Sequence, residues 1–338
     1  MPDRTALLIL STAIACGVPP EEKTEDAAGS PLDTSTPLDD QDDEDTGNPS
    51  QDDTDTDTDT TGDDSGDSDT DEPDDTGLDA VDYRQLGPYS TTSTSTTLTA
   101  SCMAPTVITA PTTAGSWPRL VLAHGFMRGT DQMVGWAEHI ASWGVEVVSP
   151  SLCHASIAGT DHPQNGADLV TWNEVLGGGD VIYAGHSAGG LAALLAASED
   201  ENAIGLIGLD LTDADSIGQS SAPSVDVPTY ALAGIPSSCN NSGNGVNTIR
   251  AVADSTMIRV TDADHCDFEN ETDWLCTSFC NNTSSSFSDS QIRDSVLGLF
   301  TAATMGLSES DPDATDVWWR PGGSFYEELS AQGALSNL

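Results

Sequence analysis

Apolar and polar positions divide this chain into three parts. A short apolar run stands near the N-terminus, an almost purely polar stretch follows it, and from about residue 81 short apolar blocks recur. Some blocks are continuous and rich in β-branched residues, which is typical of buried strands. Others repeat apolar residues every three or four positions, which is typical of helices that bury one face. The third part therefore alternates between strands and helices.

This alternation predicts an α/β fold built on a doubly wound, mostly parallel sheet with helices on both faces. Asp131 is expected to cap the first helix. The predicted strands are 91–100, 106–110, 119–123, 145–148, 181–184, 203–209, 228–233 and 256–260, and the predicted helices are 131–143, 163–176, 191–197, 246–253 and 288–305.

The length of one loop and the pattern of the C-terminal stretch indicate what lies over the predicted sheet. About seventeen residues separate Asp210 from Pro228, at a place where lid or cap domains are often inserted. We therefore expect no large cap domain and an open, shallow cleft. The C-terminal stretch around Trp318 and Trp319 is expected to pack back on the domain, and its pattern indicates no role.

The N-terminal apolar run resembles an export signal. Arg4 precedes an apolar core at 6–15, and Ala13-Ile14-Ala15-Cys16 resembles a bacterial lipobox, in which the cysteine is lipidated. We expect residues 1–16 to be a lipoprotein-type signal with Cys16 as the lipidation site, and an ordinary cleaved signal is the alternative. Gly17 resembles the residue that follows the cysteine in lipoproteins sent to an outer membrane. The expected location is the outer membrane or the cell surface, with a lipid anchor rather than a membrane span.

The polar stretch at 17–80 is acidic and repetitive. Between Glu21 and Asp79 it holds twenty-five acidic residues and one basic residue. Such a stretch repels itself and has almost nothing apolar to bury, so a disordered tether is expected. Alternating aspartates such as Asp57 and Asp59 resemble part of a calcium loop. The later ligand positions of such a loop lack carboxylates here, so a spacer is favoured over a specific calcium site.

Charge excludes one class of partner for the remaining part, 81–338. It contains thirty Asp and Glu residues against seven Arg and no Lys. Proteins that bind nucleic acid need cationic side chains for the phosphates, so we expect no nucleic-acid partner.

Cysteine usage agrees with an exported protein. Six cysteines remain when Cys16 is set aside, which suggests up to three disulfides of open connectivity. The alternative is a metal site formed by His265, Cys266, Cys276 and Cys280, but the spacing of these four residues fits no common zinc pattern. We expect neither a metal nor a cofactor. The cysteines are Cys102, Cys153, Cys239, Cys266, Cys276 and Cys280.

One motif carries chemistry. Gly185-His186-Ser187-Ala188-Gly189 lies between a predicted strand and a predicted helix. A sharp strand-to-helix turn crowds the backbone around the serine, so the residues two positions away must lack side chains. The turn exposes the Ser187 hydroxyl as a nucleophile and aims the Ala188 N–H at an oxyanion. A glycine-rich turn without function is the alternative.

A serine nucleophile needs a base, and the base needs an orienting carboxylate. His265 is the histidine that follows the last predicted strand, and a solvated loop histidine is the alternative reading. Asp210, which ends the strand after the nucleophile helix, is the leading acid, and Asp213 is its rival. The loop after the strand at 228–233 offers no carboxylate.

The second oxyanion donor is expected from the turn after the strand at 119–123. Gly125 allows close approach of the backbone, and the Phe126 N–H can point at the oxyanion. Phe126 and Met127 are expected to line the substrate pocket. Phe126 as a plain core residue is the alternative.

Four segments together carry a family resemblance: His124-Gly125-Phe126, 185–190, Gly208-Leu209-Asp210 and 264–268. They resemble the chlorophyllase-type and dienelactone hydrolase–cutinase-like α/β-hydrolases, and the region around Gly87-Pro88-Tyr89 is similar to polyester hydrolases. The resemblance covers about residues 85–305. Polyester hydrolases usually carry the acid after the later strand, whereas chlorophyllases carry it where Asp210 stands here.

The resemblance implies an α/β-hydrolase domain at 81–338 and a serine esterase that forms an acyl intermediate. We expect a monomeric, membrane-anchored enzyme that acts on lipid, polyester or other bulky esters. A non-catalytic binding or adhesion module on a hydrolase fold is the alternative, and a functional acidic tether is a third reading.

Overall fold

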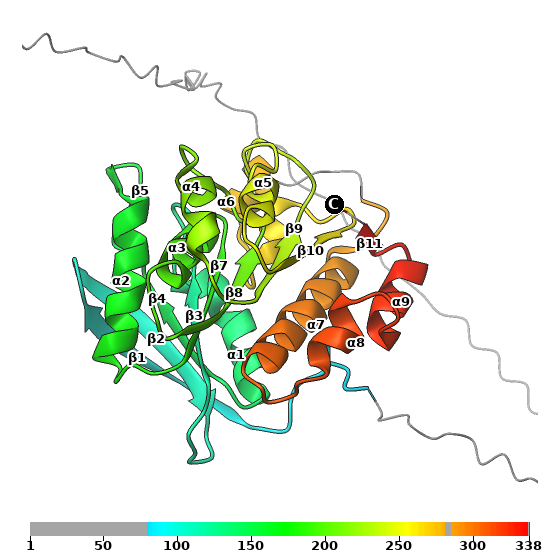
Figure 1. Cartoon of the computed structure of the whole chain (residues 1–338), viewed down its shortest axis with the longest axis horizontal. Coiled ribbons are helices and arrows are strands. Elements are labelled where there is room, and N and C mark those ends of the chain that lie inside the picture. The colour runs from blue at the N-terminus through cyan, green and yellow to red at the C-terminus, as the bar shows by residue number, and fades with distance from the viewer. Residues whose placement is uncertain (1–79, 281–284, 337) are drawn as a thin grey trace, which may run out of the picture. The chain divides into compact units, whose positions relative to one another are not determined.

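The computed structural model describes residues 80–280, 285–336 and 338 (Figure 1). The expected signal peptide with Cys16, the acidic tether and the aspartate repeat all lie outside the described residues.

A nine-stranded sheet organises the described part of the chain. Its order is β1-β2-β4-β3-β7-β8-β9-β10-β11, and the strands from β4 to β10 along this order run parallel. Strands β1, β2 and β11 pair antiparallel to their neighbours. The strands are β1 (Thr91–Thr99), β2 (Met103–Pro111), β3 (Arg119–Ala123), β4 (Glu146–Pro150), β7 (Val181–His186), β8 (Ala203–Leu209), β9 (Thr229–Ala233), β10 (Ser255–Val260) and β11 (Leu335–Ser336), with a separate hairpin of β5 (Ala155–Ser156) and β6 (Gly159–Thr160).

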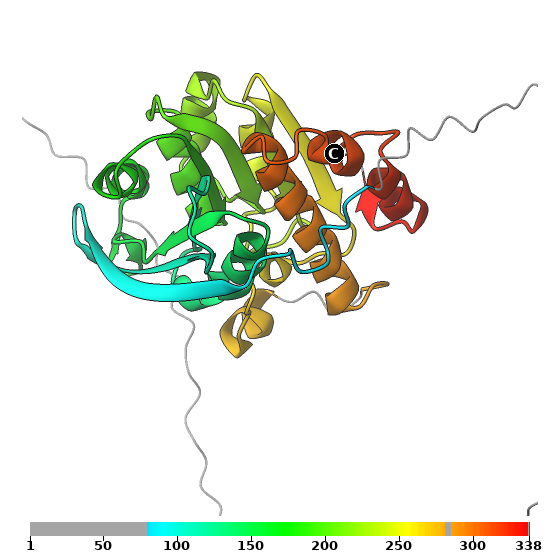
Figure 2. The same ribbon diagram turned by 90° about the horizontal axis from the view of Figure 1, so that it is seen from below.

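Helices lie on both sides of the sheet (Figure 2). Because the central strands are covered on both faces, they are apolar at successive positions rather than alternating with polar ones. The helices are α1 (Val134–Ser142), α2 (His162–Val175), α3 (Ala188–Ala197), α4 (Ile217–Ser221), α5 (Gly245–Arg250), α6 (Trp274–Cys280), α7 (Asp289–Leu307), α8 (Ala314–Trp319) and α9 (Ser324–Ala331), and short 3₁₀ turns are η1 (Thr130–Met133), η2 (Ala222–Ser224) and η3 (His265–Phe268).

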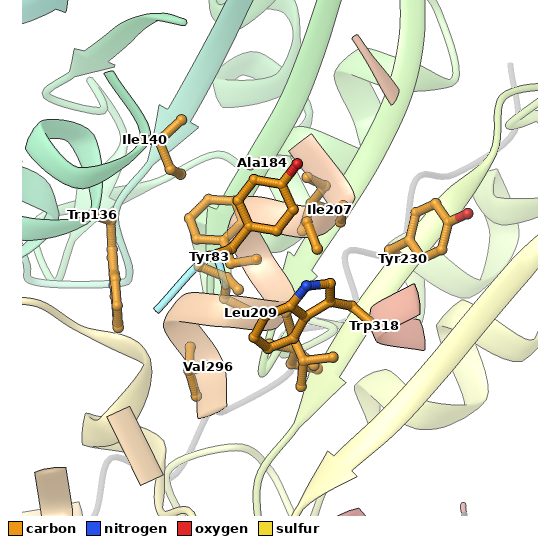
Figure 3. Packing of buried hydrophobic residues seen from close by; sticks show 14 of the residues in the cluster. Tyr83, Trp136, Ile140, Ala184, Ile207, Leu209, Tyr230, Val296 and Trp318 are labelled. Carbon is orange, nitrogen blue, oxygen red and sulfur yellow. The ribbon is translucent and has the colours of Figure 1, made fainter. Parts of the chain in front are cut away.

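Each face of the sheet has its own hydrophobic cluster, and alternate residues of one strand divide between them. Leu120 and Leu122 face the cluster formed with α1, α7 and α8. Val121 and Ala123 face the cluster formed with α2 and α3. Figure 3 shows the first cluster, in which large side chains from far-apart segments meet, among them Tyr83, Trp136, Tyr230 and Trp318.

The predicted fold class is confirmed, and every strand and helix that the pattern predicts is present. The expectation that Asp131 caps the first helix is wrong. Asp131 lies inside the 3₁₀ turn η1, whose N-cap is Gly129 with its backbone N–H donating to the Gln132 side chain at 2.9 Å, and the N-cap of α1 itself is Met133. No large cap domain interrupts the described residues between β8 and β9, which are joined by α4 and η2.

The C-terminal stretch packs on the domain through its two adjacent tryptophans, as predicted. Both side chains are buried, and the Trp319 Nε1–H donates to the Leu299 carbonyl at 2.9 Å. The Trp318 Nε1–H donates to the Val81 carbonyl at 3.1 Å, which fixes the start of the domain to its end. Strand β11 then extends the sheet beside β10.

Three disulfides, Cys102–Cys153, Cys239–Cys280 and Cys266–Cys276, confirm the prediction from cysteine usage. The first joins the β1–β2 turn to the loop after β4, near one edge of the sheet. The other two join the loops after β9 and β10 to helix α6, toward the other edge. Across the described ranges, no helix has both the length and the apolar content that a bilayer span requires.

We predict that the Cys102→Ala/Cys153→Ala double variant loses about 4 kcal/mol of unfolding free energy, because the bridge closes a loop of 51 residues in the unfolded chain. Equilibrium denaturation in urea under non-reducing conditions measures this. A midpoint equal to that of the wild type would show that this bridge does not constrain the unfolded state.

Candidate active site

The turn between β7 and α3 holds Ser187 in a strained backbone conformation, with φ 56° and ψ −121°. A side chain at Gly185 would overlap the carbonyl of Gly189 across the turn. A side chain at Gly189 would overlap the carbonyls of Ala123 and His124 on the neighbouring strand end. The two glycines of the motif are therefore required by the close approach of β3, β7 and α3.

Three side chains from separate strand ends form one hydrogen-bonded chain. His265 Nε2 lies 2.9 Å from Ser187 Oγ, and His265 Nδ1 lies 2.6 Å from Asp210 Oδ2. All three side chains are buried. A carboxylate accepts only, so Nδ1 carries the proton and Nε2 is free to accept one from the serine. The structure thus brings together the three residues that the sequence put forward as nucleophile, base and leading acid.

Asp210 is itself held by groups from the loop after β9. The Gly234 N–H donates to its Oδ1 at 2.9 Å, and the Asn240 side-chain amide donates to its Oδ2 at 3.0 Å. Asn240 is completely buried, and its own oxygen accepts from the Ser237 and Gly243 N–H groups. The sequence does not predict Asn240, because an amide donor in a polar loop has no distinctive pattern.

Asp213, the rival acid, does not join this chain of hydrogen bonds. Its Oδ1 accepts from the Gly218 N–H at 2.8 Å, and its Oδ2 accepts from Gln219 N–H and Thr248 Oγ1, each at 2.9 Å. These bonds satisfy the first turn of α4. Asp213 therefore holds the start of α4 and joins it to Thr248 of α5 rather than to His265.

The two expected oxyanion donors, the backbone N–H groups of Phe126 and Ala188, come from turns that meet at Ser187: Ala188 directly follows it, and a Cβ added at Gly125, next to Phe126, would lie 3.2 Å from the Ser187 Cβ. Neither N–H donates a hydrogen bond to another residue in the described part of the chain. His124 fixes the first turn: its Nε2 accepts from the Leu152 N–H at 2.9 Å, so its Nδ1–H donates to the Gly125 carbonyl at 2.8 Å. Burial lowers the pKa of His124 to about 4, which keeps it neutral in this bonding pattern. Two such N–H groups can receive an oxyanion.

A cavity of about 320 Å³ opens beside Ser187 and His265. Phe126 and Met127 line this cavity, and their role in binding the substrate stays a prediction. Both side chains are partly exposed at its mouth.

An ion pair that sequence reasoning missed joins the two loops of the site. The Arg128 guanidinium forms a bidentate pair with the buried Glu269 carboxylate, with both N···O distances 2.6 Å. Burial raises the pKa of Glu269, and the Arg128 charge opposes that rise. Arg128 follows the Phe126 turn, and Glu269 follows η3, so this pair fixes the turn relative to the His265 loop. Two charges separated by 141 positions leave no local pattern in a sequence.

The His186 side chain lies close to both His265 and Glu269. Its ring centroid is 4.5 Å from that of His265, and its Nδ1 is 3.7 Å from Glu269 Oε1. Complete burial holds the pKa of His186 well below its usual range, so the ring is neutral. It packs against the His265 ring as an uncharged surface.

The cysteines considered as metal ligands lie close together: the Sγ atoms of Cys266, Cys276 and Cys280 are within 4.8 Å of one another. Each of them is in a disulfide. A metal binds the thiolate, so in this oxidised state these sulfurs are not available as ligands.

A family model described as "Chlorophyllase" matches residues 80–279, which is more than half of the chain. The search of curated proteins found no match to this chain.

Asp267 is buried in the turn that carries His265, and its Oδ2 accepts from the Asp264 N–H at 2.8 Å. Burial, reinforced by the neighbouring Asp264 carboxylate, raises the pKa of Asp267 to about 7. In the unfolded chain an aspartate titrates near pH 4. Between these two values the folded protein keeps a proton that the unfolded chain has released, so the stabilisation from that proton is lost as pH rises.

We predict that the unfolding free energy of the wild type, relative to that of Asp267→Asn, falls between about pH 4 and about pH 7 and is flat above, because the amide does not titrate. Urea denaturation at a series of pH values measures the difference. A difference that is constant over this window would contradict the raised pKa.

Proposed function

Because the chain belongs to the chlorophyllase family of α/β-hydrolases, we propose that it is a serine esterase that cleaves carboxylic esters through an acyl intermediate on Ser187. The family makes it an ester-hydrolysing α/β-hydrolase. The observation that carries the residue assignment is the hydrogen-bonded chain from Ser187 Oγ through His265 to Asp210, at 2.9 and 2.6 Å.

In the proposed acylation step, Ser187 Oγ attacks the ester carbonyl carbon while His265 Nε2 takes its proton. Negative charge develops on the carbonyl oxygen, where the N–H groups of Phe126 and Ala188 stabilise it. Asp210 stabilises the imidazolium and keeps its ring in place. The tetrahedral intermediate then collapses, and His265 returns the proton to the leaving alcohol.

In the proposed deacylation step, water replaces the alcohol. His265 takes a proton from the water as it attacks the acyl carbon, and the proton then returns to Ser187 Oγ as the acid leaves. The proton transfers between Ser187 Oγ and His265 Nε2 run along a hydrogen bond that is already present at 2.9 Å.

We propose that the substrates are lipid, polyester or other bulky esters. The support is the short β8–β9 connection, which adds no cap over the cavity, and the partly exposed apolar side chains at its mouth. An ester too large to be enclosed can approach such a site.

We also propose that the protein is an exported, monomeric lipoprotein, anchored through Cys16 in the outer membrane or at the cell surface. The support is the lipobox-like sequence before Cys16 and the acidic stretch that separates it from the hydrolase domain. Disulfides are expected of an exported protein and rare in a reducing cytosol.

We predict that purified protein hydrolyses p-nitrophenyl esters and that Ser187→Ala lowers kcat at least about 10⁴-fold. Asp210→Asn should lower kcat about 10⁴-fold with little change in KM, because the imidazole loses its orienting charge. Asp213→Asn is the matched control, a buried aspartate on the same loop, and it should keep kcat within about threefold of the wild type once the protein is folded. Steady-state kinetics measures all three.

Two outcomes would count against this assignment. An equal loss of kcat in Asp210→Asn and Asp213→Asn would contradict the assignment of Asp210 as the carboxylate that orients His265. A folded, oxidised wild-type protein without activity on any ester would favour the binding-module alternative.

We predict that cells expressing the full chain incorporate radiolabelled palmitate into it and that Cys16→Ala abolishes this labelling, because the lipid is joined through the cysteine thiol. Cys102→Ala serves as a control for the loss of any cysteine. Export without labelling would indicate an ordinary cleaved signal.

A further inference from the structure

Helix α6 lies beside the catalytic cavity and is held there by covalent bonds. It has seven residues, and Cys276 is its one buried residue. A helix of this length is not stable alone in water, and it has no apolar face against the core. Two disulfides attach it, Cys276 to Cys266 and Cys280 to Cys239. In Figure 2, α6 is the short gold helix that stands away from the sheet.

The attachment points of α6 belong to the two loops that complete the site. Cys266 directly follows His265, and Cys239 directly precedes Asn240, the residue that holds Asp210. A third contact orients the start of the helix. Asp273 accepts from the Leu275 N–H at 3.0 Å and also pairs with Arg128 at 3.0 Å. The position of α6 is therefore tied to the triad and to the Phe126 turn.

Helix α6 presents two large aromatic side chains to the surface. Trp274 is 74% exposed and Phe279 is 73% exposed. Leu275 and Phe279, four positions apart, lie on one side of the helix and line the cavity, whereas Trp274 does not line it. Phe126 and Met127 line the cavity from the turn after β3.

The charges that line the cavity cancel. Arg128 and Glu269 are bound to each other, and burial keeps His186 neutral. An extended apolar chain in the cavity would therefore contact hydrophobic side chains without stripping water from an unpaired charge.

We propose that α6 is a specificity-determining wall and that Leu275 and Phe279, with Phe126 and Met127, bind an extended, uncharged apolar chain of the ester. This proposal rests on the proposed function, because it names the substrate class for that site. Each methylene that leaves water on binding increases affinity about fourfold when it is fully buried. Esters with long linear chains should therefore be preferred over acetate esters.

The test uses two exposed aromatic residues of the same helix. Phe279→Ala removes part of the wall, and Trp274→Ala removes an equally exposed ring outside the cavity. For both variants and the wild type, kcat/KM is measured for p-nitrophenyl esters with acyl chains of about two to ten carbons and for alkyl butyrates of the same range, all below their solubility limits. The alkyl series covers binding of the chain on the alcohol side.

We predict that in at least one series the wild type prefers the longest chain over the shortest. Phe279→Ala should reduce this preference about three- to tenfold, with a larger loss of kcat/KM for the longest ester than for the shortest, because one or two methylenes of the long chain lose part of their contact. Trp274→Ala should follow the wild-type profile. A Phe279→Ala profile equal to that of the wild type, or an equal effect of Trp274→Ala, would overturn the proposal.

A binding measurement separates failure of the wall from failure of the enzyme. Calorimetric titration with 1-decanol, which has the chain but no ester bond, should show binding that Phe279→Ala weakens about three- to tenfold and Trp274→Ala does not. If the wild type hydrolyses no ester but shows this pattern, the wall stands and the esterase function fails. If it hydrolyses esters but neither preference nor binding depends on Phe279, the wall fails alone.

Discussion

Asp210 and His265 stand at the ends of two strands, β8 and β10, that are not neighbours in the sheet, and one hydrogen bond of 2.6 Å joins them across the end of β9. The rest of the site is arranged around that bond. The loop after β9 supplies Gly234 and Asn240, which fill the remaining sites on the carboxylate. The imidazole is packed against the neutral His186 ring. A buried carboxylate needs such partners, because an unpaired charge there would be costly.

Much of the fold could be predicted because its signals are local. Parallel strands covered on both faces are short apolar runs, and the six parallel strands β3, β4, β7, β8, β9 and β10 lie where the pattern predicts them. Ser187, His265 and Asp210 could also be proposed from local context: Ser187 and Asp210 directly follow β7 and β8, and His265 lies in the loop that follows β10. Their catalytic roles stay predictions, as does the lipid anchor at Cys16.

What the sequence did not reveal depends on contacts between distant positions. The Arg128–Glu269 pair spans 141 positions, and neither residue stands in a motif. Asn240 was passed over because an amide in a polar loop has no distinctive pattern. Helix α6 was missed for a different reason: its exposed aromatic residues follow no core-facing period, and disulfides rather than burial hold it. Asp131 failed as a cap because a glycine backbone N–H and Gln132 begin that turn instead.

In most helices the same side chains both hold the helix on the core and form its exposed surface. In α6 disulfides hold the helix, so its exposed side chains are less constrained by folding. Its exposed residues, including Trp274 and Phe279, contribute little to the hydrophobic core, so they are free to vary at small cost in folding free energy. Two disulfides and the Asp273–Arg128 ion pair keep the helix in place. Related enzymes could therefore diverge toward other esters by changing the residues between the bridges, while the catalytic loops behind them stay as they are.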